Sequence, residues 1–146
     1  MTDIDWDDIE ALDNLDESED APAEPELVYG SAGEFFTIKL AGLYRREVSG
    51  TVTGRRWCPQ WWTHSEALSR IESLWRAWEH LRLDGATGMS VWWRDHADHH
   101  MNALLSPDGT FAHCSVKNGH HDESSAIAPL PQHDPPPELF PDARTA

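Results

Sequence analysis

Two cysteines and several histidines are the residues of this chain whose side chains could perform chemistry or bind a metal. The strongest candidates lie in three separate stretches: Cys58, His64, His96, His100 and Cys114. His96 and His100 are four residues apart, so both imidazoles would project from one face of a helix. Thiolates and imidazoles are the donors that a tetrahedral Zn²⁺ site uses. The residue types therefore predict a possible structural zinc site, with His113 as a further donor.

Two other roles for these residues stay open at the level of sequence. Buried free cysteines are common in protein cores, and histidines among tryptophans often only form hydrogen bonds. A nucleophile pair of Cys58 or Cys114 with His64 or His96 is also compatible with the sequence, which does not say which side chains meet. An HExxH protease is excluded because no glutamate follows His96, and no CxxC pair is present.

The stretch from Trp57 to Leu83, WCPQWWTHSEALSRIESLWRAWEHLRL, holds five of the eight tryptophans. Its apolar residues recur at four- and three-residue spacing, which is typical of a helix facing a core: Leu68, Ile71, Trp75 and Trp78. We expect a helix from about Thr63 to Leu83, with Thr63 and Glu66 as a capping box at its start. His64 falls on the core-facing side of this helix.

Two further helices are predicted on either side of that central one. The first runs from about Ala32 to Val48, capped by Ser31 and Glu34, with three apolar residues facing inward: Phe36, Leu40 and Leu43. The second runs from about Val91 to Leu105 and carries His96 and His100 on the same face as Trp92. The short segment from Thr110 to Cys114 is predicted to be extended. We therefore expect a small, mostly α, three-helix bundle-like domain.

Charge and composition divide the chain into three parts. Residues 1–26 contain 12 acidic residues and no basic one, out of a net charge of −15 for the whole chain. We expect residues 1–30 to be a disordered acidic tail, residues 31–116 to form the helical domain, and residues 117–146 to be a disordered tail rich in proline and histidine.

The acidic tail indicates what kind of partner the chain would favour. It repels nucleic acid and membrane surfaces and suits a basic protein partner. Its apolar residues recur every three positions, as in a short helix that forms on a partner, although scattered apolar residues in a solvated tail give the same pattern: Trp6, Ile9, Leu12 and Leu15. With two cysteines, no apolar signal segment and no membrane-spanning run, we expect a cytoplasmic protein with reduced thiols.

Tryptophans outside the helical stripe are candidates for a binding surface. Trp61, Trp62 and Trp93 could be exposed platforms for a protein partner or, by stacking, for single-stranded nucleic acid. Arg55 and Arg56, with two further arginines ten residues earlier, form a small basic cluster. Such a cluster meets phosphate in some proteins, and more often it balances nearby acidic groups.

The motif WCPQWW…H…EA…LW…WE, followed by GMSVWWRDHADHHM and by the segment around Phe111 and Cys114, resembles an actinobacterial domain of unknown function, the family numbered 4913. The likeness covers about Phe35 to Cys114. It implies a setting in plasmids, integrated elements and phages, and it implies no activity and no catalytic residue.

Together these patterns favour a non-enzymatic interaction or accessory protein of the mobile-element type that binds a protein partner. The alternative is a small metal- or thiol-dependent enzyme, or a zinc-stabilised nucleic-acid accessory protein, built on four residues: Cys58, His64, His96 and Cys114. The disposition of those side chains separates the two classes.

Overall fold

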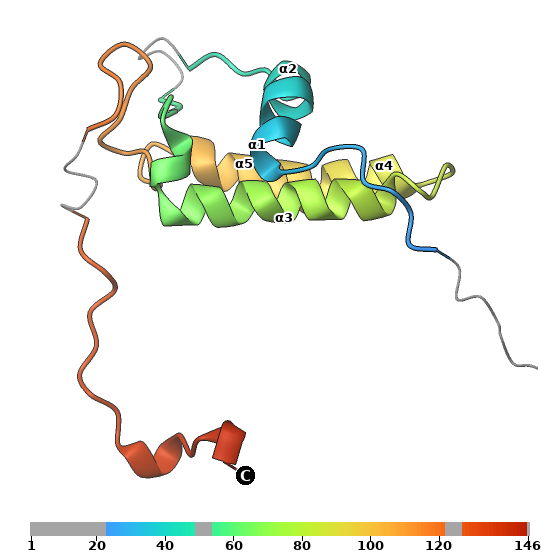
Figure 1. The fold of residues 1–146 in the computed structure, drawn as a ribbon. Helices are drawn as coiled ribbons and strands as arrows, with labels where there is room; N and C mark the ends of the chain where they lie inside the picture. Colours follow the sequence, from blue (N-terminus) through green and yellow to red (C-terminus); the bar gives the residue numbers. More distant parts are fainter. Residues whose placement is uncertain (1–22, 49–53, 122–126, 146) are drawn as a thin grey trace, which may run out of the picture.

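The computed structural model describes residues 23–48, 54–121 and 127–145. Three helical stretches pack against one another, as the sequence predicts (Figure 1). Within the described residues there is no sheet, and a single isolated bridge pairs Ser115 with Gly119. Of the acidic tail predicted to be disordered, residues 1–30, the first 22 residues and the apolar repeat inside them lie outside the described part of the chain.

The central helix, α3, runs from Ser65 to Leu81 and follows a short 3-10 turn, η4, at Trp61–Thr63. Its buried apolar side chains follow the predicted spacing, displaced by one position at its start: Ala67, Ile71, Leu74, Trp75 and Trp78. Leu68 is not part of this stripe, because its side chain is 43% exposed. The spacing alone assigned it to the core because Leu68 lies only about 100° from Ala67, at the edge of the apolar face.

The start of α3 also differs from the predicted capping box. The Thr63 hydroxyl donates to the Gln60 carbonyl oxygen at 2.7 Å, and so it does not cap the helix. The N-cap is His64, whose backbone is extended and whose side chain makes no capping bond. The helix therefore begins two residues later than predicted, and the His64 side chain is left for other contacts.

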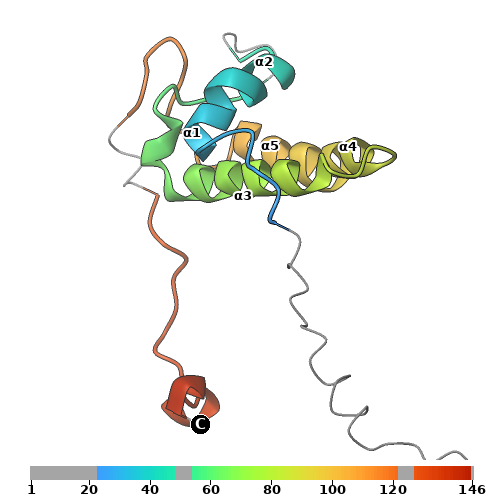
Figure 2. The ribbon, with the colours of Figure 1, turned by 45° about the vertical axis from the view of Figure 1, so that its right-hand side comes forward.

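The second long helical stretch consists of α4 (Gly88–Val91), a π-helical segment η5 (Trp92–Ala97) and α5 (Asp98–Leu105). It returns antiparallel beside α3 (Figures 1 and 2). The Trp92 indole donates to the Leu74 carbonyl oxygen at 3.1 Å inside the core. Because a π turn holds one residue more than an α turn, the buried position after Trp92 is Ala97, five residues on. His96 and His100 are therefore not on the buried face of this stretch, contrary to the predicted shared face.

The first helical stretch crosses above these two (Figure 1). It consists of α1 (Ala32–Phe35), a π-helical segment η3 (Phe36–Leu40) and α2 (Ala41–Leu43), and so it ends five residues before the predicted Val48. The Ser31 half of the predicted capping box is confirmed, because the Ser31 hydroxyl accepts from the Glu34 N–H at 3.1 Å; the Glu34 carboxylate accepts from the Gly30 N–H at 2.7 Å, one residue before the N-cap. The π turn again shifts the phase of the helix. Phe35 and Leu40 are fully buried, whereas Phe36 is half-buried and Leu43 is exposed.

Aromatic side chains fill the space between the three helical stretches. The Phe35 ring lies 5.8 Å from that of Trp78 and 6.4 Å from that of Trp92, each measured between centroids. Tyr29 packs on Trp78 at 5.3 Å. Rings of this size bury large apolar areas, so a small domain gains much of its stability here.

The segment before α1 is held by a buried carboxylate. Glu79, which is only 5% exposed, accepts the N–H groups of Val28 and Tyr29 at 2.8–3.1 Å and the Arg82 guanidinium at 3.0 Å. The contact network of the helical domain therefore begins before residue 31, which was its predicted first residue. The predicted boundaries themselves stay a prediction.

From the end of α5 to residue 121 the chain folds back without forming a strand. Residues 110–114 form consecutive turns, in which the Ala112 and Cys114 N–H groups donate to the Gly109 and Phe111 carbonyl oxygens. Residues 127–145 are exposed and include two short 3-10 turns, Pro137–Leu139 and Ala143–Thr145. Of the helices that the structure describes, none combines the length and apolar character needed to cross a membrane.

Candidate metal centre

Four side chains meet at one end of the domain, where the start of α3 lies beside the loop that follows α5: Cys58, His64, Cys114 and His120. Each presents one sulfur or nitrogen atom, and all four atoms lie within 4.8 Å of one another. Three of the predicted metal ligands are thus brought together. The fourth member, His120, was not predicted.

The first pair of ligands comes from the turn that leads into α3. Cys58 is followed by Pro59 and then by the 3-10 turn η4, so the chain makes a compact loop before His64. The Gln60 backbone N–H donates to the Cys58 sulfur. Because His64 is the uncapped N-cap residue of α3, its ring is free to point toward Cys58 and Cys114 and not back toward the helix.

The second pair of ligands comes from a loop closed by backbone hydrogen bonds. The Gly119 N–H donates to the Ser115 carbonyl oxygen at 2.7 Å, and the Ser115 N–H donates in return at 3.2 Å. Gly119 has a φ of +76°, in the left-handed region that favours glycine, and it reverses the chain there. This reversal brings His120 back beside Cys114.

Distances between the donor atoms agree with tetrahedral zinc. His120 Nδ1 lies 3.3 Å from Cys58 Sγ and 3.8 Å from Cys114 Sγ, and His64 Nε2 lies 3.6 Å from Cys114 Sγ. Zinc–sulfur and zinc–nitrogen bonds of about 2.3 and 2.0–2.1 Å at tetrahedral angles place sulfur and nitrogen about 3.6 Å apart. These three distances bracket that value, and all four donor atoms lie within 4.8 Å of one another, so the donors are placed close enough together to bind one ion.

Hydroxyl groups beside the cluster contact its two imidazoles. The Thr110 hydroxyl lies 3.5 Å from His64 Nδ1, the nitrogen that faces away from Cys114. Such a contact to the distal nitrogen fixes ring orientation in metal sites. The Thr63 hydroxyl lies 3.4 Å from His120 Nδ1, which two sulfurs also approach. One ring nitrogen carries at most one proton or one lone pair, so three such neighbours exceed what it can satisfy by hydrogen bonding alone.

Burial controls the protonation of the cluster when no metal is bound. Cys58 and Cys114 are 0% and 1% exposed, and His64 is 5% exposed. Burial is the main cause that raises the pKa of Cys58 to about 11; the N–H of Gln60 opposes this shift, and the neighbouring Cys114 adds to it. Burial also lowers the pKa of His64, with a smaller contribution from His120. At neutral pH the metal-free site thus holds a neutral His64, ready to coordinate, and a Cys58 thiol that must lose its proton.

The two remaining predicted ligands lie elsewhere. His100 Nδ1 is 2.9 Å from the Arg70 guanidinium, whose charge adds to burial in lowering the pKa of that histidine. His96 is half-buried, and neither residue belongs to the cluster. In this structure they do not join the four clustered side chains, and His100 instead contacts Arg70 of α3. His113, the donor in reserve, is exposed.

The predicted aromatic platforms differ in exposure. Trp61 is 5% exposed and packs on Phe36, at 4.9 Å between ring centroids, so it is a core residue and not a surface platform. Trp62 is 54% exposed. Trp93 is half-buried and stacks on Tyr44 at 5.9 Å. The predicted basic residues Arg55 and Arg56 both line a hollow on the surface, together with Trp57.

One signal in the sequence could have identified His120. The chain contains the spacing Cys-x5-His twice, as CPQWWTH from Cys58 and as CSVKNGH from Cys114. Structural zinc sites commonly take two ligands from each of two short stretches of chain. The other local pattern, the i,i+4 pair of His96 and His100 in η5 and α5, indicates residues that are not in the cluster.

Comparison with known proteins identifies a family but no activity. Residues 29–136 match the family described as "Domain of unknown function (DUF4913)", which covers more than half of the chain, so the chain belongs to this family. The match includes all four residues of the cluster. No curated protein and no solved structure matches the chain.

Proposed function

We propose that this member of the DUF4913 family is a non-enzymatic interaction domain, stabilised by a zinc ion that Cys58, His64, Cys114 and His120 hold. The observation that carries the proposal is the convergence of two sulfur and two nitrogen donors within 4.8 Å. Thiolate and imidazole donors in this number favour Zn²⁺ over the hard, oxygen-seeking Mg²⁺ and Ca²⁺.

A structural role for the ion follows from the closure of the site. Catalytic zinc sites keep one position open for water or substrate, whereas structural sites have four protein ligands. Here four protein ligands are available, and both cysteines and His64 are buried. The ion would join the start of α3 to the loop after α5, two segments 50 residues apart in sequence. In a domain of this size, such a link substitutes for a larger core.

The thiol-enzyme alternative has weaker support. A nucleophilic cysteine works as a thiolate and normally has a lowered pKa. The pKa of Cys58 is instead raised to about 11 by burial in the metal-free chain. A site with zinc would use both thiolates as ligands, which also removes them as nucleophiles.

The partner that this proposal favours is a basic protein surface, bound through residues 1–26. Their 12 acidic residues and lack of basic ones support electrostatic attraction to such a surface. The cysteine donors require a reducing compartment, which is the basis for proposing a cytoplasmic location. The expected setting of the family in plasmids, integrated elements and phages extends the proposal to an accessory role in a mobile element. A nucleic-acid accessory role is the second candidate, and a basic surface around Arg55 and Arg56 is the observation in its favour.

Metal analysis of the purified full-length chain tests the proposal. We expect one zinc per chain, and we expect replacement by Co²⁺ to give the visible absorption of a tetrahedral site with thiolate ligands. At free zinc a thousandfold above the Kd, the ion would add about 4 kcal/mol to the free energy of unfolding. For a domain of this size that corresponds to roughly 15–30 °C in Tm, lost in excess chelator. A chain that is purified without zinc, binds none when it is added, and melts at the same temperature in chelator would refute the metal.

A further inference from the structure

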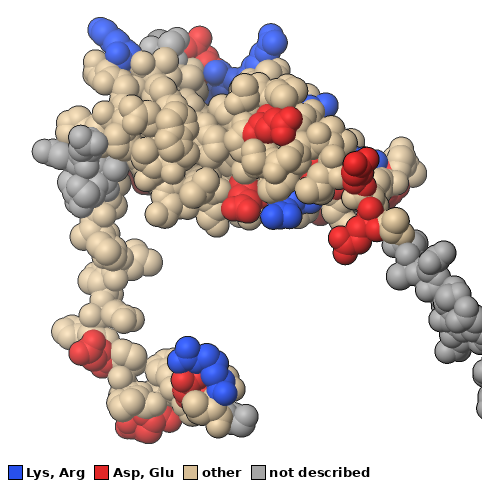
Figure 3. Space-filling model, in the orientation of Figure 1, with Lys and Arg blue, Asp and Glu red and all other residues tan. Residues whose placement is uncertain are grey.

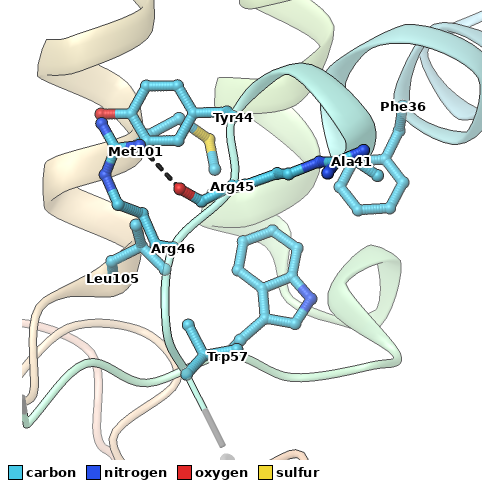
Figure 4. A pocket seen from close by; sticks show the side chains of 9 residues that line it. Phe36, Ala41, Tyr44, Arg45, Arg46, Trp57, Met101 and Leu105 are labelled. Atoms are coloured by element: carbon cyan, nitrogen blue, oxygen red, sulfur yellow. Dashed lines mark hydrogen bonds between the residues drawn. The ribbon is translucent and has the colours of Figure 1, made fainter.

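A hollow on the surface between α2 and the chain segment at Trp57 has an apolar floor. Tyr44, Met101 and Leu105 line one side of it and Trp57 lines the other (Figure 4). A second hollow, which shares Val48 and Trp57 with the first, continues the surface toward the loop after Cys114. We call these two adjacent hollows together the basic groove.

Basic side chains line this groove. Five contribute to the two hollows, and the described lining contains no acidic residue: Arg45, Arg46, Arg55, Arg56 and Lys117. Figure 3 shows Lys and Arg side chains along the upper edge of the domain, where an acidic side chain also lies, while most of the Asp and Glu side chains of this view lie lower and to the right. Glu47 is exposed but does not line either hollow.

Two of these arginines are held in place without a carboxylate. Arg45 Nε donates to the Gly42 carbonyl oxygen at 2.9 Å, and Arg46 Nη1 donates to the Arg45 carbonyl oxygen at 2.8 Å. The Arg46 guanidinium also lies over the Tyr44 ring, at 4.2 Å from its centroid. Among the residues that the structure describes, neither guanidinium forms an ion pair. Their charge is therefore available to an acidic ligand.

The chain itself contains a segment of matching chemistry. Residues 3–20 combine ten acidic side chains, and no basic one, with four apolar residues at three-residue spacing: Trp6, Ile9, Leu12 and Leu15. The groove offers the complement, with apolar side chains on its floor and positive charges around it. We propose that this acidic segment docks in the basic groove of its own chain.

The length of the chain permits this contact. The anchor of the N-terminal segment is Val28, whose N–H is bound by Glu79 near the end of α3. The groove lies toward the other end of the domain, beside the end of α5, and α3, with 17 residues, is about 25 Å long. The 13 residues from Leu15 to Val28 span up to about 43 Å when extended. A tether of this kind gives a millimolar effective concentration, so weak affinity is enough for docking.

Docking in the groove would control when the segment reaches a partner. A basic partner surface would compete with Arg45 and Arg46 for the same carboxylates, so binding would require the segment to leave the groove. The inference depends on the groove and on charge, not on the metal, and it stands or falls separately from the zinc site.

Paramagnetic broadening in the full-length chain tests the proposal. A nitroxide attached through Asn14→Cys is expected to broaden the NMR signals of Arg45, Arg46 and the Trp57 indole, while signals of α4 keep their intensity. The broadening should weaken in about 1 M salt, where the screening length falls to about 3 Å. The unsubstituted chain, treated with the same reagent, is the blank, because Cys58 and Cys114 are buried.

Charge reversal in the groove supplies the matched comparison. Arg45→Glu with Arg46→Glu is expected to abolish the broadening, whereas Arg76→Glu with Arg94→Glu, an equal charge change at exposed helix positions, should preserve it. Absence of broadening at the groove would overturn the proposal. So would broadening that appears only when spin-labelled and isotope-labelled chains are mixed, which indicates a second copy. If the nitroxide leaves the groove signals unbroadened and an added single-stranded oligonucleotide shifts them, the groove is a nucleic-acid site and the proposal is overturned.

Discussion

His64 Nε2 lies 3.6 Å from Cys114 Sγ, although 50 residues separate them in the sequence. The contact joins the N-cap residue of the central helix α3 to the loop that follows α5. It also explains why α3 has no side-chain cap, since the residue in the N-cap position turns its ring toward the cysteines. The usual side-chain cap is thus absent from α3, and the side chain at its N-cap position contacts the cysteines instead.

The neighbouring histidines 120 and 121 give the sharpest test of the ligand set. We expect His120→Gln to lower zinc content and to reduce Tm by an amount close to that produced by chelator, because it removes one of four donors. His121→Gln changes the adjacent exposed residue and should keep one zinc per chain. Zinc content by elemental analysis and Tm by calorimetry are the measurements. Equal zinc content in the two variants would remove His120 from the site.

Zinc affinity should depend on pH in a defined direction. Burial raises the pKa of Cys58 to about 11 in the metal-free chain, so at pH 7 the ion must displace its proton. Apparent affinity is therefore expected to rise by at least about tenfold per pH unit between about pH 7 and 9, since one proton is released per ion bound. Burial lowers the pKa of His64, so that residue does not add to the slope above neutral pH. Competition with a chromophoric chelator measures the slope, and an affinity independent of pH would contradict the ligand role of Cys58.

The fold class was predictable from sequence because its signals are local. The apolar spacing of α3 and the Ser31–Glu34 cap each depend on residues within a few positions of one another. The π turns at η3 and η5 were not predictable in this way. A π turn changes the period of the helix without a residue type that marks it, so residues beyond it, such as His100, were assigned to the wrong face.

The candidate metal site was predictable only in part, because its ligands come from segments far apart in the sequence. Residue type alone identified Cys58, His64 and Cys114 as donors. Which histidine completes the set depends on how the loop after Cys114 returns, and that return is set by Gly119 in its left-handed conformation. The repeated Cys-x5-His spacing is a local signal that carries this information, whereas helical periodicity does not.

Which face of α3 is buried can be tested at Ile71 and Leu68, whose side chains have the same size. Ile71→Ala should lower the free energy of unfolding by about 2–5 kcal/mol, because Ile71 is fully buried. Leu68→Ala should change it by no more than about 0.5 kcal/mol, because its side chain is 43% exposed. Urea unfolding of both variants provides the comparison. If Leu68→Ala were the more destabilising change, the buried stripe would have the phase that the sequence pattern predicted.

Gly88, the first residue of α4, lies very close to the backbone at the end of α3. A Cβ atom at this position would lie 1.8 Å from the Leu81 carbonyl oxygen, which is backbone and cannot rotate away. Gly88→Ala should therefore destabilise the domain by at least about 2 kcal/mol. At Gly42, in α2, a Cβ meets nothing within 4 Å, and Gly42→Ala should stabilise by about 0.5–1 kcal/mol. Thermal melts that rank the two variants in the opposite order would show that the α3–α4 junction is more open.

Glu79 is expected to make the stability of the domain sensitive to acid. Burial alone would raise the pKa of this carboxyl group, but the N–H groups of Tyr29 and Val28 and the Arg82 guanidinium together lower it. A carboxyl group with a lowered pKa stabilises the fold above its unfolded-state pKa, near 4.3, and loses that contribution as pH falls through the folded-state value. Glu79→Gln should cost about 1–3 kcal/mol at pH 7, because an amide cannot accept all of these donors.

The control for this prediction lies on the same helix. Glu72 is exposed and forms a long ion pair with Arg76, at 3.8 Å, which is also exposed. Because such surface pairs contribute little, Glu72→Gln should change the free energy of unfolding by less than about 0.5 kcal/mol. In urea unfolding between about pH 3 and 7, the stability of the Glu79→Gln variant should vary less with pH than that of the unchanged chain. Equal pH dependence in the two would show that Glu79 does not anchor the segment around Tyr29, and with it the entry of the N-terminal chain into the domain.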